Sequence, residues 1–142
     1  MIQYDFDPER SFTRVFVSGE LEDAAMLPWF RRFLDDLRGA ERVSGIVDTR
    51  SVTHLKVTGE TVRQMTRLVE TREQVFAGSR WGLVANRDAL FGMARMYQLM
   101  RDQAPYEICV FRDMDAAREW FEEEVGAPGP PGRAARWCLV ES

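Results

Sequence analysis

The chain has 142 residues and a formal charge of −4, with 45% hydrophobic and 30% charged residues. This size and composition predict one soluble globular domain with its own core, and the acidic balance disfavours a nucleic-acid partner, which requires a basic stripe. No apolar run approaches the roughly 20 residues of a membrane-spanning helix, and the first residues lack the basic end and apolar stretch of a signal peptide. We therefore expect a cytoplasmic protein.

The first part of the chain alternates apolar and polar side chains in two runs, residues 2–7 and 11–18. Such alternation is typical of strands that bury one face and expose the other. The sequence Pro8-Glu9-Arg10 between the two runs favours a turn. We therefore predict that an antiparallel β-hairpin begins the fold.

A helix is expected next, and Pro28 sets its predicted start. Proline fits the first turn of a helix better than the middle, because it lacks the N–H that the helix interior uses. We therefore predict a helix over 28–38 that ends at Gly39, with residues 22–27 as a short preceding turn.

From residue 45 onward, short apolar segments alternate with amphipathic helical segments in a βαβαβα order. Apolar runs separated by helices are typical of neighbouring parallel strands that are buried on both faces. Together with the hairpin they predict an α/β fold, with a mixed five-stranded sheet and about four helices. The expected strands cover 45–48, 81–85 and 108–111, and the expected helices cover 59–76, 87–103 and 114–124.

We expect this domain to cover residues 1–124, because the composition changes after it. Residues 126–132 read Gly-Ala-Pro-Gly-Pro-Pro-Gly, which is typical of a linker. Residues 125–142 are therefore expected to be a linker and a C-terminal tail, which either adds an edge strand or stays without regular structure. An edge strand in the tail or the hairpin would also offer a surface for a homodimer.

The segment from Asp48 to Thr61 contains most of the polar residues that could form a site. We expect the strand to end at Asp48, a polar loop to follow, and a helix to begin at Thr58-Gly59. Ligands and partners of open α/β sheets usually bind at the carboxyl ends of strands and the amino ends of helices. The predicted junction surface consists of Asp48, Arg50, Ser51, His54, Lys56 and Gly59.

Individual junction residues also have structural interpretations. Asp48 and Arg50 pair with each other, or Asp48 caps the loop by accepting backbone N–H bonds, or the two residues form the polar rim of a binding site. His54 is the only histidine, and it is expected on the surface or in packing, since base catalysis needs a positioned partner that the sequence does not supply. No nucleophile–base pair, phosphate loop or metal-ligand spacing is visible, and the two cysteines lack CxxC spacing. We therefore expect no enzyme activity, no cofactor and no metal.

The order of elements and the junction resemble the anti-sigma-factor antagonists: the bacterial STAS domains and SpoIIAA-like proteins, a group also described as STAS/SEC14-like. Val47-Asp48 matches the end of the family's strand, Val52 matches its loop valine, and Lys56-Val57-Thr58-Gly59 matches its helix start. The segment from Val110 to Phe121 is similar to the family's last strand and helix. The resemblance covers about residues 1–124 and implies a SpoIIAA-like fold.

The resemblance also implies a role for Thr58. In well-known members a serine or threonine at this position is phosphorylated by a partner kinase, and the phosphate releases the partner. Here Lys56 and Val57 replace an acidic residue and a serine, and Glu60 already places a carboxylate in the first helical turn. Thr58 is therefore either a phosphoacceptor or simply the N-cap of the helix, and the changed neighbours favour the N-cap.

The segment 87–103 carries a wide apolar surface that is rich in methionine. Such a surface packs in the core, lines a pocket for an apolar ligand, or faces a partner. Core packing is the simplest of these three interpretations. The residues that would form an apolar ligand site or partner surface are Phe91, Met93, Met96, Tyr97 and Met100.

Two functions follow from these observations. The first is a non-enzymatic, STAS-like regulatory module that binds a protein partner, such as a kinase or an anti-sigma-type regulator. It predicts an exposed patch of Val57, Thr58, Val62 and Met65, and no deep pocket. The alternative is a binding protein for a small apolar or lipid-like ligand, which predicts a pocket of several hundred Å³ lined by Phe91, Met96 and Met100.

Overall fold

The structure is a computed structural model that describes residues 1–101 and 103–126. The strands are β1 (Ile2–Asp7), β2 (Phe12–Glu22), β3 (Ser44–Lys56), β4 (Arg80–Val84) and β5 (Glu107–Phe111). The helices are α1 (Asp23–Asp36), α2 (Gly59–Glu70), α3 (Glu73–Phe76), α4 (Asp88–Met100) and α5 (Met114–Gly126). Most of the predicted linker and tail, residues 127–142 of the predicted 125–142, lies outside the described residues.

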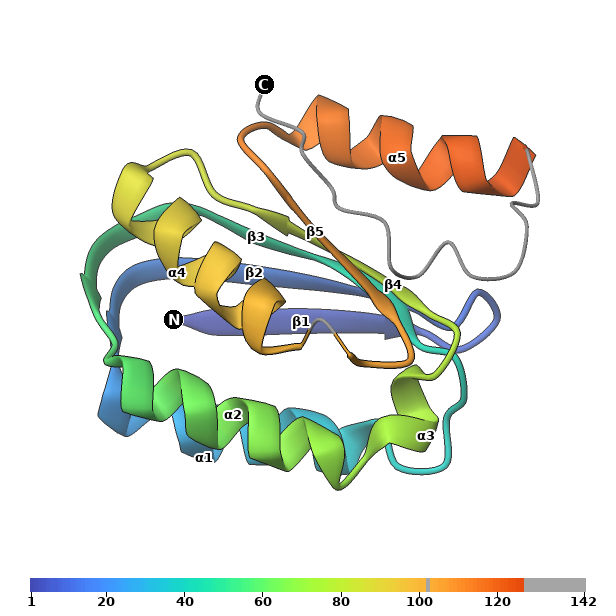
Figure 1. The fold of residues 1–142 in the computed structure, drawn as a ribbon, viewed down its shortest axis with the longest axis horizontal. Coiled ribbons are helices and arrows are strands. Elements are labelled where there is room, and N and C mark those ends of the chain that lie inside the picture. Colours follow the sequence, from blue (N-terminus) through green and yellow to red (C-terminus); the bar gives the residue numbers. More distant parts are fainter. Residues whose placement is uncertain (102, 127–142) are drawn as a thin grey trace.

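The strands form one mixed sheet in the order β1-β2-β3-β4-β5, in which β1 is antiparallel to β2 and all other neighbours are parallel. This confirms the predicted five-stranded α/β fold. Because each parallel strand adds to the same side of the previous one, right-handed crossovers place α1, α2, α3 and α4 on one face of the sheet. Helix α5 follows the last strand and covers the opposite face (Figure 1).

The two faces of the sheet bury two separate sets of apolar side chains. The larger core lies under α1 to α4 and includes Phe33, Val69 and Trp81. The smaller one lies under α5 and includes Val84 and Phe111. Adjacent residues of β4 and β5 alternate between the two cores, as expected for strands buried on both faces.

The predicted loop after Asp48 is wrong, because β3 continues to Lys56. Its second half pairs with the second half of β2, from Ser18↔Ser51 to Glu22↔Lys56, while β4 pairs with β3 only as far as Asp48. The pairing with β2 skips one residue of β3 at each of two places, so β3 contains two bulges. The bulges break the period of two, and this irregularity made a strand resemble a polar loop.

Glycine allows this long β2–β3 pairing at two positions. Gly19 has φ of +75° beside a bulge, a conformation that other residues rarely adopt. At Gly45, a Cβ atom would lie 2.6 Å from both the Thr13 carbonyl oxygen and the Trp81 ring. Only glycine therefore lets Trp81 pack directly over β3 (Ser44–Lys56).

Two helix boundaries also differ from the predictions. Helix α1 begins at Asp23, five residues before the expected start, and contains Pro28 in its interior. Proline removes the hydrogen bond to the carbonyl of Ala24, but both residues lie on the exposed side, where water reaches that carbonyl. The predicted helix 59–76 is divided at Thr71, whose hydroxyl donates to the carbonyl of Leu68 at 2.6 Å.

Candidate functional site

The junction residues Asp48 and Arg50 form a closed ion pair on the α5 side of the sheet. The carboxylate of Asp48 accepts from the Arg50 backbone N–H at 3.0 Å and from Nε and Nη2 of its guanidinium at 2.9 Å each. Partial burial raises the pKa of Asp48, but the hydrogen bonds from Arg50 outweigh it and hold this pKa below its ordinary value. The two groups are therefore occupied with each other.

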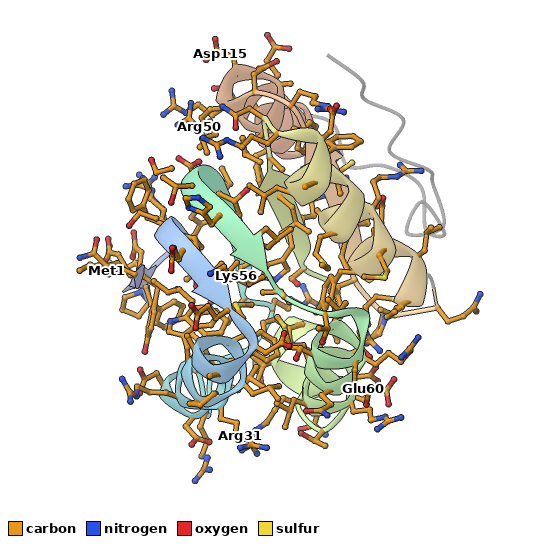
Figure 2. The ribbon with its side chains drawn as sticks, turned by 90° about the vertical axis from the view of Figure 1, so that its left-hand side faces the viewer. Met1, Arg31, Arg50, Lys56, Glu60 and Asp115 are labelled. Carbon is orange, nitrogen blue, oxygen red and sulfur yellow. The ribbon has the colours of Figure 1, made fainter. Side chains whose placement is uncertain are left out.

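The structure does not gather the rest of the predicted junction surface. Asp48 and Lys56 pair with Phe16 and Glu22 of β2, which are six residues apart, so the two ends are separated by about 20 Å at the rise of a β-strand. Figure 2 shows Arg50 beside Asp115 of α5, whereas Lys56 and Glu60 lie toward the other helices. Ser51 and His54 are exposed, and the His54 ring lies 3.2 Å from the Thr53 hydroxyl. Gly59 lies against Met96 of α4.

Thr58 is the N-cap of α2, and it also contacts α1. Its Oγ1 accepts from the Thr61 backbone N–H at 3.4 Å. The same hydroxyl donates to Asp23 Oδ2 at 3.0 Å, and the Thr58 backbone N–H donates to Asp23 Oδ1 at 2.8 Å. The hydroxyl that the resemblance would make a phosphoacceptor is thus used as both donor and acceptor.

The expected exposed patch around Thr58 is not present. Val62 is 3% exposed, and Val57 and Met65 are half-buried and pack against the larger core. All three side chains line an internal cavity instead. The prediction of no deep pocket, which came with the regulatory hypothesis, is therefore wrong.

The cavity lies inside the larger core, between the sheet and helices α1, α2 and α4, and its volume is about 180 Å³. It is smaller than the several hundred Å³ that the ligand hypothesis predicted. Of the five predicted side chains, Met93 and Tyr97 line it, whereas Phe91, Met96 and Met100 do not. The helical spacing of Met93 and Tyr97 therefore identified part of the face that α4 turns toward the sheet, while the other three residues lie outside it.

Helix α4 is held to the fold near its two ends, and the cavity lies under its middle. Leu90 is buried near the first turn, and Gln98 Nε2 donates to the Ile108 carbonyl at 2.8 Å near the last. Between them, Ala94 is too small to fill the space above the sheet, and it lines the cavity. An apolar void of this kind remains because the neighbouring side chains have fixed positions.

Arg101, which the sequence analysis did not single out, fixes the end of α4. Its guanidinium is 4% exposed and contacts Glu70 at 3.2 Å, Glu73 at 2.8 Å and the Tyr106 hydroxyl at 3.2 Å. Tyr97 interacts with Tyr106 in turn, and burial raises the pKa of Tyr97 well above its ordinary value. This network closes one end of the cavity with groups that satisfy each other.

The polar atoms at the cavity wall are few. The Thr49 hydroxyl donates to the Val84 carbonyl at 2.7 Å, and the Trp81 indole N–H donates to the Val43 carbonyl at 2.9 Å. Trp29 of α1 also lines the cavity with its ring, while its Nε1 is buried in the surrounding packing and has no hydrogen-bond partner within the described residues. The residues around Trp29 in the sequence do not predict this unpaired N–H, because it depends on the tertiary packing alone.

Fold and cavity together define an α/β protein in which helices on one face of a mixed sheet and the sheet itself line an apolar pocket. The structure is similar to the crystal structure of an uncharacterised protein of the DUF3478 family with a SpoIIAA-like fold from Shewanella loihica PV-4. The TM-score is 0.56 at 14% sequence identity, over 84% of this chain and 91% of that one. The fold is therefore SpoIIAA-like, as the resemblance implied.

Comparisons at the level of sequence add no further relative, since neither a model of a protein family nor a curated protein matches the chain. Within the described residues, no helix has the length and apolar character to cross a membrane. The fold likeness says nothing about a ligand, so functional arguments depend on the geometry of this chain.

Proposed function

We propose that this protein is a non-enzymatic binding module that holds a small apolar molecule in the cavity between its sheet and helices α1, α2 and α4. The observation that carries the proposal is a volume of about 180 Å³ lined by apolar side chains. An engineered apolar cavity of about 150 Å³ stays dry and binds benzene. A space of this size therefore has room for one substituted ring or a short branched chain.

The position of the cavity supports binding over incomplete packing. Its wall is built from four helices and the sheet, since Phe76 of α3 also lines it, and Met26 and Met93 line it from different helices. Methionine side chains adapt to ligands of different shape, because they are unbranched and rotate easily. An empty space of this volume would also leave its lining atoms without contacts on one side, and a bound molecule would restore those contacts.

The test compares ligand binding by wild type with binding by a variant whose cavity is filled. Ala94→Leu adds three carbon atoms at the cavity wall, and Ala89→Leu adds the same atoms at an exposed position of the same helix. We expect toluene to raise the thermal unfolding midpoint of wild type and Ala89→Leu in a concentration-dependent way, and to leave that of Ala94→Leu unchanged.

Native mass spectrometry of freshly purified protein provides a second readout. We expect a small co-purified molecule on wild type that Ala94→Leu lacks. Wild-type protein without a bound molecule, together with no response to saturating toluene, would exclude the proposed function.

A second candidate is a regulatory module that binds a protein partner, and the SpoIIAA-like fold supports it. Its switch would be phosphorylation of Thr58. A phosphate there would lie next to the Asp23 carboxylate, which is 3.0 Å from the hydroxyl, and like charges would push α1 and α2 apart. In this hypothesis phosphorylation acts by opening the contact between the two helices.

Pull-down from the native host with Thr58→Glu tests that switch. Thr53→Glu is the matched control, because Thr53 is also exposed and lies outside the α1–α2 contact. The switch requires a partner that binds wild type and Thr53→Glu but not Thr58→Glu. Equal binding to all three proteins argues against it.

A further inference from the structure

Helices α1 and α2 form a groove on their outer side, which faces away from the sheet. We propose that this groove binds a short acidic and apolar segment of a partner protein, whose carboxylates are bound by Arg31 and Arg67. Figure 2 shows Arg31 on the side of α1 away from the sheet. The groove has a volume of about 320 Å³ and is lined by Leu27, Arg31, Gln64, Arg67, Leu68 and Thr71.

The groove is a different place from the apolar cavity. The two share no lining residue, because the cavity lies under the helices and the groove lies on top of them. Binding in the groove therefore does not depend on the function proposed for the cavity.

Two side-chain contacts hold α1 and α2 at a fixed separation. Thr58 donates to Asp23 where the two helices begin, and Arg72 donates to Asp35 at 3.1 Å where they end. The helices therefore run in the same direction, and the groove residues of each helix lie between these two contacts. A groove that is already formed costs a partner little in ordering the protein.

The groove carries positive charge that the surrounding side chains do not balance. Arg31 and Arg67 are exposed, and neither forms an ion pair within the described residues. No acidic residue lines the groove, although the whole chain has a formal charge of −4. Three acidic side chains of the same helices are already paired: Asp35 with Arg38 and Arg72, Glu60 with Arg63, and Glu70 with Arg101.

Unbalanced guanidinium groups favour a partner with carboxylates. An arginine binds a carboxylate through two parallel N–H groups, a geometry that a single ammonium group cannot provide. Arg31 and Arg67 come from different helices, so one segment that lies along the groove meets both of them. The expected segment therefore carries more than one Asp or Glu.

The leucines of the groove define the rest of the partner. Leu27 and Leu68 are half-buried and line the groove beside the arginines. An inorganic anion would leave this apolar surface unused, and a nucleic acid needs a longer basic stripe than two arginines provide. An aliphatic side chain that covers the leucines gains from apolar burial.

The length of the groove limits the segment that fits it. From Gln64 to Thr71 it extends about 10 Å along α2, at the rise of an α-helix. This is the length of about three residues of an extended chain. The predicted motif is an aliphatic residue with an acidic residue on each side.

Selection from a library of random dodecapeptides displayed on phage tests this chemistry without assuming a sequence. Peptides are selected on wild type, and those that also bind Arg31→Glu/Arg67→Glu are removed. The affinity of each enriched peptide is then measured for wild type, Arg31→Gln and Arg67→Gln. Arg32→Gln is the matched control, since Arg32 is exposed beside Arg31, has the same charge and does not line the groove.

We expect the enriched peptides to carry Asp or Glu on both sides of an aliphatic residue. Arg31→Gln and Arg67→Gln should each weaken binding about threefold to fivefold, the upper range for an exposed ion pair. Arg32→Gln should bind as wild type does. High salt should weaken binding to wild type, because exposed charges are screened.

Three outcomes would overturn the inference. The first is a selection that yields no peptide whose binding requires Arg31 and Arg67. The second is a set of arginine-dependent peptides without acidic residues. The third is arginine-dependent binding to vesicles of anionic lipid with no enriched peptide, which would assign the groove to a membrane surface. If a variant does not fold, the amide signals of wild type that a bound peptide shifts decide, and shifts outside α1 and α2 exclude the groove.

Discussion

Asp23 and Thr58 lie 35 residues apart in the chain and join the first turns of α1 and α2 through two hydrogen bonds. The Thr58 backbone N–H donates to Asp23 Oδ1 at 2.8 Å, and its hydroxyl donates to Oδ2 at 3.0 Å. Two helix N-termini, each with a positive dipole end, thus share one carboxylate. The position that the family resemblance assigns to an added phosphate already has an anion beside it.

This contact predicts a pH dependence of stability. The Thr58 backbone N–H, followed by the Thr61 side chain, lowers the pKa of Asp23 below its ordinary value of 3.8. A carboxylate whose pKa is lower in the folded state stabilises the fold fully above its unfolded pKa. This stabilisation is lost as the pH falls from about 4 through the folded-state pKa.

Asp23→Asn should therefore be less stable than wild type at neutral pH, with a difference that shrinks below about pH 4. Urea unfolding at a series of pH values measures it. Asp36→Asn is the matched control, because Asp36 is an exposed residue at the other end of the same helix. A difference between Asp23→Asn and wild type that is constant with pH would contradict the assignment.

The contacts of the buried Arg101 guanidinium predict that removing them strongly lowers the stability of the fold. Arg101→Met keeps much of the side-chain volume but loses the contacts to Glu70, Glu73 and Tyr106. We expect the free energy of unfolding to fall by about 2 kcal/mol, as for the loss of charged hydrogen bonds. Arg101→Lys should recover only part of it, because one ammonium group cannot reach all three partners. Full stability of Arg101→Met would show that the network is not needed.

Replacing glycine with alanine should have opposite effects on stability at Gly45 and at Gly92. Gly45→Ala places a Cβ 2.6 Å from the Thr13 carbonyl oxygen, and we expect a loss of about 1–3 kcal/mol from overpacking. Gly92 is exposed within α4 and has no atom within 4 Å of an added Cβ. Gly92→Ala should therefore raise stability by about 0.5–1 kcal/mol through helix propensity. Equal effects of the two variants in chemical denaturation would contradict the packing at Gly45.

The cavity also predicts a stabilising substitution in the absence of any ligand. Ala94→Leu should raise the free energy of unfolding by about 1–2 kcal/mol, as cavity-filling changes do. Ala89→Leu, on the exposed side of α4, should stay within about 0.5 kcal/mol of wild type. A loss of stability in Ala94→Leu would mean that the space is too narrow for the added atoms.

Much of the fold was readable from local patterns in the chain. The alternation in residues 2–7 and 11–18 predicted the hairpin, and the short apolar runs predicted the parallel strands, because side-chain burial has a period set by each element. The resemblance carried by Val47-Asp48 and Val52 implied the SpoIIAA-like fold. The errors occurred where long-range pairing overrode local pattern, in the bulged half of β3 and around Pro28 in α1.

The sequence by itself determined the order of the elements, the mixed sheet and the absence of a recognisable catalytic motif, since these depend on composition and periodicity. Only the tertiary structure decided what the candidate residues do. It separated Asp48 from Lys56 along one strand, joined Thr58 to Asp23, and left an apolar pocket between the sheet and the helices. A cavity and an unpaired donor arise from side chains far apart in the chain, whose mutual distances no local pattern records.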